Sequence, residues 1–222
     1  MDWTALALSV QLGGATLAVL LPLSIALGRT LAVRRFPGRS VVEAMVALPL
    51  ILPPTVVGFY LLHAFGSQSA IGGFFSSLAG QTLAFSFEGL VVASMLVNLP
   101  FAVQPVQRAF EGIPRDVREA AACCGMTWWR ALVAIELPLA WPGIATAAVL
   151  TFAHTLGEFG VVLMVGGNIP AETRTLSIAI YDRVQAFDDR GAGIMAATLL
   201  ALATVTLAMT NALSRRLVRR HD

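Results

Sequence analysis

Lysine is absent from this chain of 222 residues, and all 15 basic residues are arginines. The phosphate-binding loop Gly-x-x-x-x-Gly-Lys-Ser/Thr requires a lysine, and so does Schiff-base catalysis. The chain therefore cannot hydrolyse ATP by the usual route, and an ATP-driven role would need a separate ATPase. The motifs His-Glu-x-x-His and Gly-x-Ser-x-Gly are missing as well, which argues against an intramembrane enzyme. We predict no catalytic residue, no cofactor and no metal site.

Charge and cysteine are also scarce. Charged residues make up 13% of the chain, against roughly a quarter in soluble domains. Hydrophobic residues make up 57%, and the mean hydropathy is +0.76. The two cysteines, Cys123 and Cys124, are adjacent in a segment that we place in the reducing cytoplasm. We therefore expect no structural disulfide.

The hydrophobic residues form runs longer than the ~18 residues that mark a membrane span. We predict an all-α membrane protein, a bundle of about five transmembrane helices that forms one domain over residues 1–222. The expected spans cover residues 8–31, 41–65, 89–106, 132–156 and 192–213. The apolar stretch Val161–Gly167 is too short to span, so we expect a continuation, a bend or a re-entrant piece there.

Arginine placement predicts the orientation of this bundle. Twelve arginines fall near the same ends of the expected spans: Arg29, Arg34, Arg35, Arg39, Arg108, Arg115, Arg118, Arg130, Arg215, Arg216, Arg219 and Arg220. The other three fall on the opposite side: Arg174, Arg183 and Arg190. Because cytoplasmic loops carry an excess of basic residues, we expect the N-terminus outside and the C-terminus in the cytoplasm.

Prolines interrupt the second and third expected spans. Pro49, Pro53 and Pro54 lie in the second, and Pro100 and Pro105 lie in the third. Each removes a backbone donor and bends its helix. Carbonyl groups freed inside a membrane must be covered by protein or face a wet cavity. These prolines either kink the helices for packing or mark helices that line a pathway.

Polar residues within the expected spans give further candidates. Asn98, just before Pro100, either satisfies the kinked backbone or lines the pathway. Glu158 lies near the outer end of the fourth span, where ionisable groups are often functional. His154 could face it across one helical turn, but a metal site needs more ligands than this pair offers. We expect Glu158 to act structurally or in gating, by pairing with an arginine or capping a broken helix. The candidate pathway residues are Pro53, Pro54, Asn98, Gly157 and Glu158.

Residues 114–125 form a charged segment, rich in small side chains, that is bounded by helix signals. Pro114 suits the first turn of a helix, and Asp116 places negative charge near the positive end of the helix dipole. Gly125 can adopt the left-handed conformation that ends a helix. The alanines at 120–122 leave a narrow surface that fits deep into a groove of another protein. We predict a cytoplasmic docking helix here.

The spacing of this segment resembles a known signature. Glu119-Ala120-Ala121, three residues, Gly125, nine residues and Ile135-x-Leu137-Pro138 match the loop shared by bacterial ABC-importer permeases. The resemblance implies a type I importer permease architecture, in which this loop is a coupling helix seated in a cleft of the ATPase subunit. It assigns ATPase coupling to Glu119, Ala120, Ala121, Gly125, Leu137 and Pro138. We expect Glu136, inside the signature, at the membrane surface.

Other stretches resemble the sulfate/molybdate branch of these permeases, namely residues 36–39, 48–58 and 156–160. Residues 168–175, Asn-Ile-Pro-Ala-Glu-Thr-Arg-Thr, resemble the molybdate permeases in particular, where a glycine is usual in place of Ala171. The implied function is movement of molybdate across the bacterial inner membrane by alternating access. Tungstate is nearly the same tetrahedral dianion, and sulfate is the next candidate.

The resemblance also implies the partners: a second permease copy in a homodimer, two ABC ATPase subunits, a periplasmic molybdate-binding protein and membrane lipid, but no nucleic acid. A permease must release its anion, and span interiors without arginine are consistent with a weak, transient path. A carboxylate such as Glu158 would repel an oxyanion, so we do not expect it to bind one directly. The competing hypothesis is an ion-coupled secondary transporter, which would usually show an ionisable relay and inverted repeats. Neither is evident.

Overall fold

The computed structural model describes residues 1–218, except for the side chains of residue 79 and residues 209–218. This part of the chain forms helices and no strand. The elements are α1 (Trp3–Val33), α2 (Arg39–Ile51), α3 (Pro54–Phe65), α4 (Ala70–Ala79), α5 (Phe87–Glu111), α6 (Arg115–Cys123), α7 (Trp128–Ala131), η1 (Leu132–Glu136), α8 (Leu137–Gly157), α9 (Gly160–Gly166), α10 (Leu176–Gln185) and α11 (Asp189–Val218). Arg219 and Arg220, expected on the inner side, lie outside the described residues.

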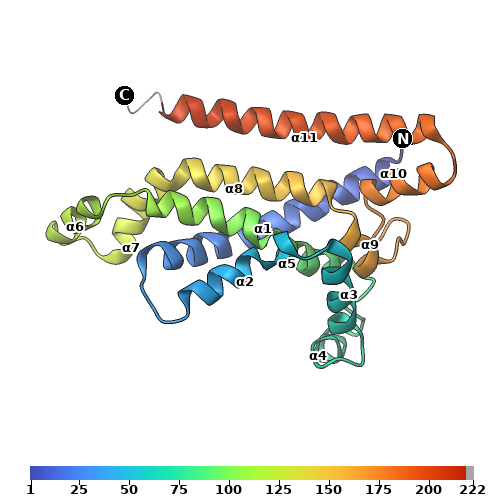
Figure 1. The fold of residues 1–222 in the computed structure, drawn as a ribbon, viewed down its shortest axis with the longest axis horizontal. Helices are drawn as coiled ribbons and strands as arrows, with labels where there is room; N and C mark the ends of the chain where they lie inside the picture. Colours follow the sequence, from blue (N-terminus) through green and yellow to red (C-terminus); the bar gives the residue numbers. More distant parts are fainter. Residues whose placement is uncertain (219–222) are drawn as a thin grey trace.

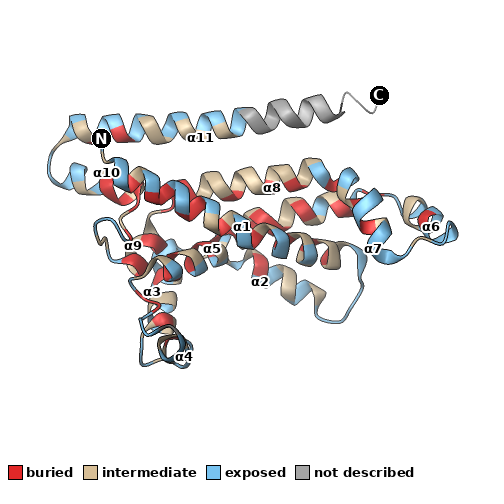
Figure 2. Ribbon diagram, turned by 180° about the vertical axis from the view of Figure 1, so that it is seen from behind, coloured by how far each residue is buried: buried red, intermediate tan, exposed pale blue. Residues whose placement is uncertain are grey.

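Four helical units are long and apolar enough to cross a membrane: α1, α5, the continuous unit Trp128–Gly157 and α11. They extend along the long axis of the molecule, with the start of α1 and the end of α11 at opposite ends (Figure 1). They contain the first, third, fourth and fifth expected spans. Within its apolar stretch α5 is 56% buried, against 11% for α11, so α5 is the central helix. Figure 2 shows α11 with a largely exposed surface.

Small residues let α5 approach its neighbours closely, as is usual between membrane helices. A Cβ added to Gly28 of α1 would lie 2.9 Å from the Val106 Cγ1 atom of α5. A Cβ added to Gly143 of α8 would lie against Ala109 and 2.8 Å from the Pro105 carbonyl oxygen. The backbones of α1 and α8 therefore pack directly on α5.

The second expected span is broken. Residues 41–65 form two helices, α2 and α3, that are bent by 112° relative to each other. Leu52 and Pro53 between them are extended, with ψ of 137° at both. The residue before a proline avoids the α-helical region, and here Leu52 and Pro53 both precede a proline. The chain thus changes direction between α2 and α3, by more than a proline kink, and α3 leaves the bundle at a steep angle (Figure 1).

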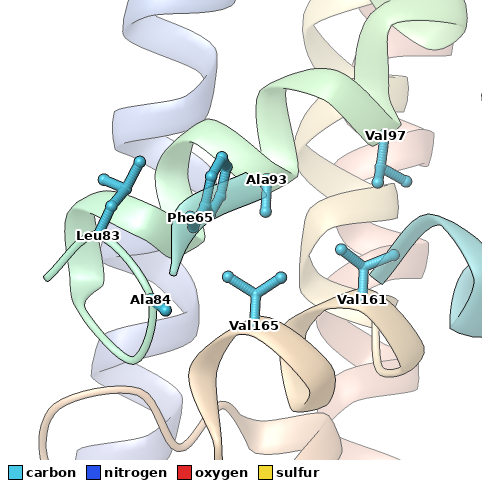
Figure 3. Close-up of a cluster of buried hydrophobic side chains, with 7 residues drawn as sticks. All are labelled: Phe65, Leu83, Ala84, Ala93, Val97, Val161 and Val165. Carbon is cyan, nitrogen blue, oxygen red and sulfur yellow. The ribbon is translucent and has the colours of Figure 1, made fainter. Parts of the chain in front are cut away.

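The segments between the expected spans also contain helices. In the Gly66–Phe87 segment, α4 is capped by Ser69, whose hydroxyl accepts from the Gly72 N–H at 2.9 Å. The stretch expected to bend or re-enter is the short helix α9. Figure 3 shows how α9 is fixed, with seven buried side chains from α3, α5, α9 and the turn before α5 packed together: Phe65, Leu83, Ala84, Ala93, Val97, Val161 and Val165.

Candidate functional site

The predicted docking helix is present as α6, at one end of the bundle (Figure 1). Pro114 precedes its first residue, and Gly125 follows it with a φ of +72°. In this left-handed turn the Met126 N–H donates to the Ala121 carbonyl oxygen at 3.1 Å, which satisfies a carbonyl that the end of a helix leaves free. Local sequence signals therefore set both ends of α6 correctly.

One side of α6 faces its own chain and the other is open. Ala121 is buried, whereas Glu119 and Ala120 are exposed. On the inner side, Val117 packs on the buried cluster formed by α5 and the start of α8, and Leu137 of the signature packs on the same cluster. The structure therefore brings the two parts of the signature together, and the exposed acidic and alanine surface remains available to a partner.

Glu136 is buried within the protein, and its expected place at the level of the membrane surface stays a prediction. Its residue exposure is 3%, and its carboxylate is paired with Arg29 of α1 and Arg118 of α6. A carboxylate can be buried when it is paired and hydrogen-bonded, and two guanidinium groups supply that pairing. The local sequence gives no signal for this, because Arg29 lies 107 positions away.

The candidate pathway residues lie around two helix breaks that meet. One break is at Pro53-Pro54, and the other is at Gly157-Glu158, between α8 and α9. A Cβ added to Gly160, at the start of α9, would lie 2.8 Å from the Pro54 Cβ atom. The chain is thus non-helical at two points that touch, where Glu158 is buried while Pro53, Pro54 and Gly157 are exposed.

The His154 side chain lies between Asn98 and Glu158, near the break at Gly157-Glu158. The His154 Nδ1 atom lies 3.2 Å from Asn98 Oδ1, and His154 Nε2 lies 3.9 Å from Glu158 Oε2. Asn98 is fully buried, and its Nδ2 atom donates to Thr155 Oγ1 at 3.0 Å and to the Ser94 carbonyl oxygen at 2.8 Å. Its amide therefore binds a carbonyl of its own helix, but the carbonyl that Pro100 leaves without a donor is that of Leu96 and not that of Ser94.

Glu158 caps the broken helix. Its Oε1 atom accepts from the Val161 N–H at 3.0 Å, in the first turn of α9, and its carbonyl oxygen accepts from Ser177 Oγ at 2.7 Å. The expected capping role is confirmed. The basic side chain beside Glu158 is His154, at 3.9 Å, which pairs with the carboxylate only when it is protonated. The described residues contain no cluster of His, Cys, Asp and Glu that could hold a metal ion.

A cavity of about 620 Å³ opens beside these breaks, between α2, α5 and α8, and sequence reasoning missed most of its lining. Pro100, Gln104 and Arg108 line it from α5, and Thr146 lines it from α8. The first three are spaced four residues apart and so share one helix face. That spacing of polar residues after a proline could have identified the face from the sequence.

The charged stretch at 182–190 closes the turn between α10 and α11. Asp188 accepts from the Gly191 N–H at 2.9 Å and pairs with Arg183 at 2.6 Å. These two contacts hold the pKa of the Asp188 carboxyl below its usual range. Asp182 binds Asn168 and Arg174 of the 168–175 stretch. Asp182, Arg183 and Asp188 thus have structural contacts, and Asp182 fixes the 168–175 stretch to α10.

These features together define the class of the protein. The chain belongs to the family described as binding-protein-dependent transport system inner membrane components, whose sequence profile matches residues 21–220. It is therefore a multi-pass inner membrane protein and a permease subunit.

Two relatives indicate the branch of this family to which the chain is similar. A molybdenum transport system permease protein of Azotobacter vinelandii is 46% identical over 187 residues, 84% of this chain and 83% of the relative. A sulfate transport system permease protein of Escherichia coli is 33% identical over 189 residues, which cover 84% of this chain and 67% of the relative.

The fold is that of known importer permeases. A chain in the crystal structure of a bacterial alginate ABC transporter, in complex with an alginate pentasaccharide-bound periplasmic protein, superposes with a TM-score of 0.75 at 22% identity. The match covers 96% of this chain and 78% of that one. The predicted type I permease architecture is confirmed at the level of the fold.

Proposed function

We propose that this chain is the permease subunit of an ATP-driven importer of molybdate. Two copies pair as a homodimer, two separate ATPase subunits bind beneath them, and a periplasmic binding protein delivers the anion from above. The observation that carries the proposal is the exposed helix α6 at one end of the bundle, joined to spans that break at the other end. The identity to molybdenum permeases supports the choice of anion.

We infer that α6 seats in a cleft of the ATPase, as its sequence predicts. Glu119 and Ala120 are exposed, and Gly125 ends the helix in a left-handed turn. Leu137 and Pro138 begin α8, directly behind the cluster on which Val117 packs. This arrangement supports a path for force from α6 into α8. Most of the described arginines lie near the α6 end, which supports a cytoplasmic location for it.

The anion path passes the touching helix breaks. Pro53, Pro54, Asn98, Gly157 and Glu158 surround them, and the neighbouring cavity adds Gln104 and Arg108. Glu158 and Asn98 hold the breaks in place through His154. The neutral groups Gln104 and Thr146 of the cavity suit passage of a dianion without tight binding, and Arg108 at the inner part of α5 supplies positive charge near the exit. Glu158 acts on the path only by holding its backbone.

Uptake into proteoliposomes tests the proposal directly. The permease is reconstituted with its ATPase and binding protein, and ATP-dependent uptake of molybdate, tungstate and sulfate is compared. We expect molybdate and tungstate to be transported and sulfate to be slower. Preferred uptake of sulfate would show that this chain is the permease of a sulfate importer. Uptake that persists without the ATPase would favour an ion-coupled transporter instead.

The coupling role of α6 is tested by Gly125→Ala. We expect ATP-dependent uptake to be lost while membrane insertion remains, because a Cβ disfavours the left-handed turn by about 1–2 kcal/mol and shifts the end of α6. Gly80→Ala is the matched control, since Gly80 also has a left-handed φ of +71° and open space around it. Equal losses in both variants would show that the defect is one of folding and not of coupling.

A further inference from the structure

Glu136 connects α6 to the membrane bundle through ion pairs. Its Oε2 atom accepts from Arg29 Nε at 2.5 Å, and its Oε1 atom accepts from Arg29 Nη2 at 3.1 Å. Arg118 Nε lies 3.4 Å from Oε1 on the other side. Arg29 belongs to α1, Arg118 belongs to α6, and Glu136 is the last residue before α8. One buried carboxylate therefore joins three elements.

Arg118 also binds a fourth element. Its Nη2 atom donates to the Phe110 carbonyl oxygen at 2.6 Å, and its Nη1 atom donates to the Ile113 carbonyl oxygen at 3.3 Å. These carbonyls lie at the end of α5, where a helix leaves acceptors free. A displacement of α6 therefore acts on α5 directly and on α1 and α8 through Glu136.

The charges make this junction depend on Glu136. Two guanidinium groups converge on one carboxylate, and each side chain is largely buried, with side-chain exposures of 21% for both arginines and 4% for the glutamate. Without the carboxylate the two cations would face each other in a low-dielectric place and repel. Arg29 and Arg118 would then push α1 and α6 apart.

Glu136 also occupies an unusual turn. Residues Leu132–Glu136 form a π-helical turn between two α-helical segments. Such turns are rare, occur as single-turn insertions in α-helices and are frequent at functional sites. Because this turn is wider than an α-helical turn, Glu136 lies on a different side of the helix from the one that a regular α-helix would give it. The backbone irregularity and the buried ion pairs thus coincide at one residue.

We propose that Glu136 is a positioning residue that transmits the movement of α6 to α1 and α8. This inference rests on the proposed function, because it assumes that an ATPase moves α6. Because Glu136 is buried and paired with Arg29 and Arg118, it acts through these arginines and keeps the coupling helix and the spans moving as one body.

The test separates coupling from folding. Glu136→Gln is compared with the wild type and with Glu43→Gln, which makes the same change at a carboxylate that pairs with Arg39 within α2 and accepts a hydrogen bond from Gln107 of α5. For each reconstituted complex, co-purification of the ATPase, ATP hydrolysis and molybdate uptake are measured. We expect Glu136→Gln to keep the ATPase and most ATP hydrolysis, while uptake per ATP falls about tenfold, a typical size for coupling between sites.

A distance measurement gives a readout that does not depend on transport. Cys123 at the end of α6 is exposed and can carry a spin label after Cys124→Ser. A second label is placed at the exposed end of α1 by Val33→Cys. We expect one narrow distance in the wild type and in Glu43→Gln, and a longer or broader distribution in Glu136→Gln.

The outcomes distinguish the inference from the proposed function. A wild-type complex without ATP-dependent uptake would defeat the proposed function itself. Unchanged uptake per ATP in Glu136→Gln, or an equal loss in Glu43→Gln, would overturn the inference alone. If Glu136→Gln fails to insert, Glu136→Asp replaces it, since it keeps the charge but is one methylene too short to serve both arginines. Loss of ATPase binding in Glu136→Asp would make Glu136 a docking residue and would also overturn the inference.

Discussion

Residues in the left-handed region show where this chain is strained. Among the described residues, four non-glycine residues have positive φ: Phe85, Asn168, Ala171 and Phe187. Asn tolerates this conformation better than most residues, but alanine does not. Ala171, with a φ of +65°, lies in the outer loop at the position where molybdate permeases usually carry glycine. The structure thus gives a physical reason for that glycine, and shows what its replacement costs here.

Ala171→Gly should therefore stabilise the protein. Relief of the left-handed strain is worth about 1–2 kcal/mol, and the extra freedom of glycine in the unfolded chain returns up to about 1 kcal/mol. We expect a small rise in the midpoint of thermal unfolding in detergent. Ala186→Gly is the control, because Ala186 is exposed with a φ of −84° and should lose stability or stay unchanged. A lower midpoint for Ala171→Gly would contradict this account.

At the scale of elements, the fold depends on close approach to α5. The long helices α1 and α8 contact α5 through glycines, and the broken span and α9 pack on its outer half. Since apolar side chains gain nothing by leaving lipid, such contacts rely on van der Waals packing and hydrogen bonds. The geometry of α5 therefore sets the position of both helix breaks.

Gly143→Ala tests this packing. The added Cβ would overlap Ala109 and approach the Pro105 carbonyl oxygen of α5, and overpacking of this kind costs about 1–3 kcal/mol. Gly14→Ala in α1 has nothing within 4 Å of the new Cβ, so it should be neutral or stabilising by up to about 1 kcal/mol. Thermal unfolding of both variants is the measurement, and the same sign of change in both would refute the close-packing argument.

At the scale of the whole molecule, the positions of the arginines and of the N-terminus indicate how the protein is oriented in the membrane. Most of the described arginines belong to α6 or to segments next to it, whereas Arg174, Arg183 and Arg190 lie in or beside α10. The start of α1 lies beside α10, at the end opposite to α6 (Figure 1). The positive-inside rule therefore supports the proposed cytoplasmic location of α6. The two cysteines of the chain lie at the end of α6 and are exposed, so they report on this face alone.

Thiol labelling tests the orientation. We expect a membrane-impermeant maleimide to label Cys123 and Cys124 in inverted membrane vesicles but not in intact spheroplasts. Labelling should be reduced when the ATPase is bound, because α6 would then be covered. Labelling from the outer side would reverse the proposed topology and would leave α6 unable to meet a cytoplasmic ATPase.

Local features of the fold could be predicted well. Runs of apolar residues located the long helices, and Pro114 and Gly125 located α6, because capping depends on residues a few positions apart. The sequence indicated the prolines of the second span correctly but not the 112° bend, since the angle depends on where α3 packs. The capping role of Glu158 was predictable because Val161 lies only three residues further on.

The sequence alone determined the class of the protein, its long helices and its docking signature, because these depend on composition, periodicity and short-range spacing. Only the tertiary structure decided that Glu136 is buried between Arg29 and Arg118, and that Asn98 meets Thr155 and His154. Arg29 and Glu136 are separated by 107 positions in the sequence. Asn98 is separated by 57 positions from Thr155 and by 56 positions from His154. Contacts over such separations depend on which helix faces pack together, and no local pattern of residues encodes that choice.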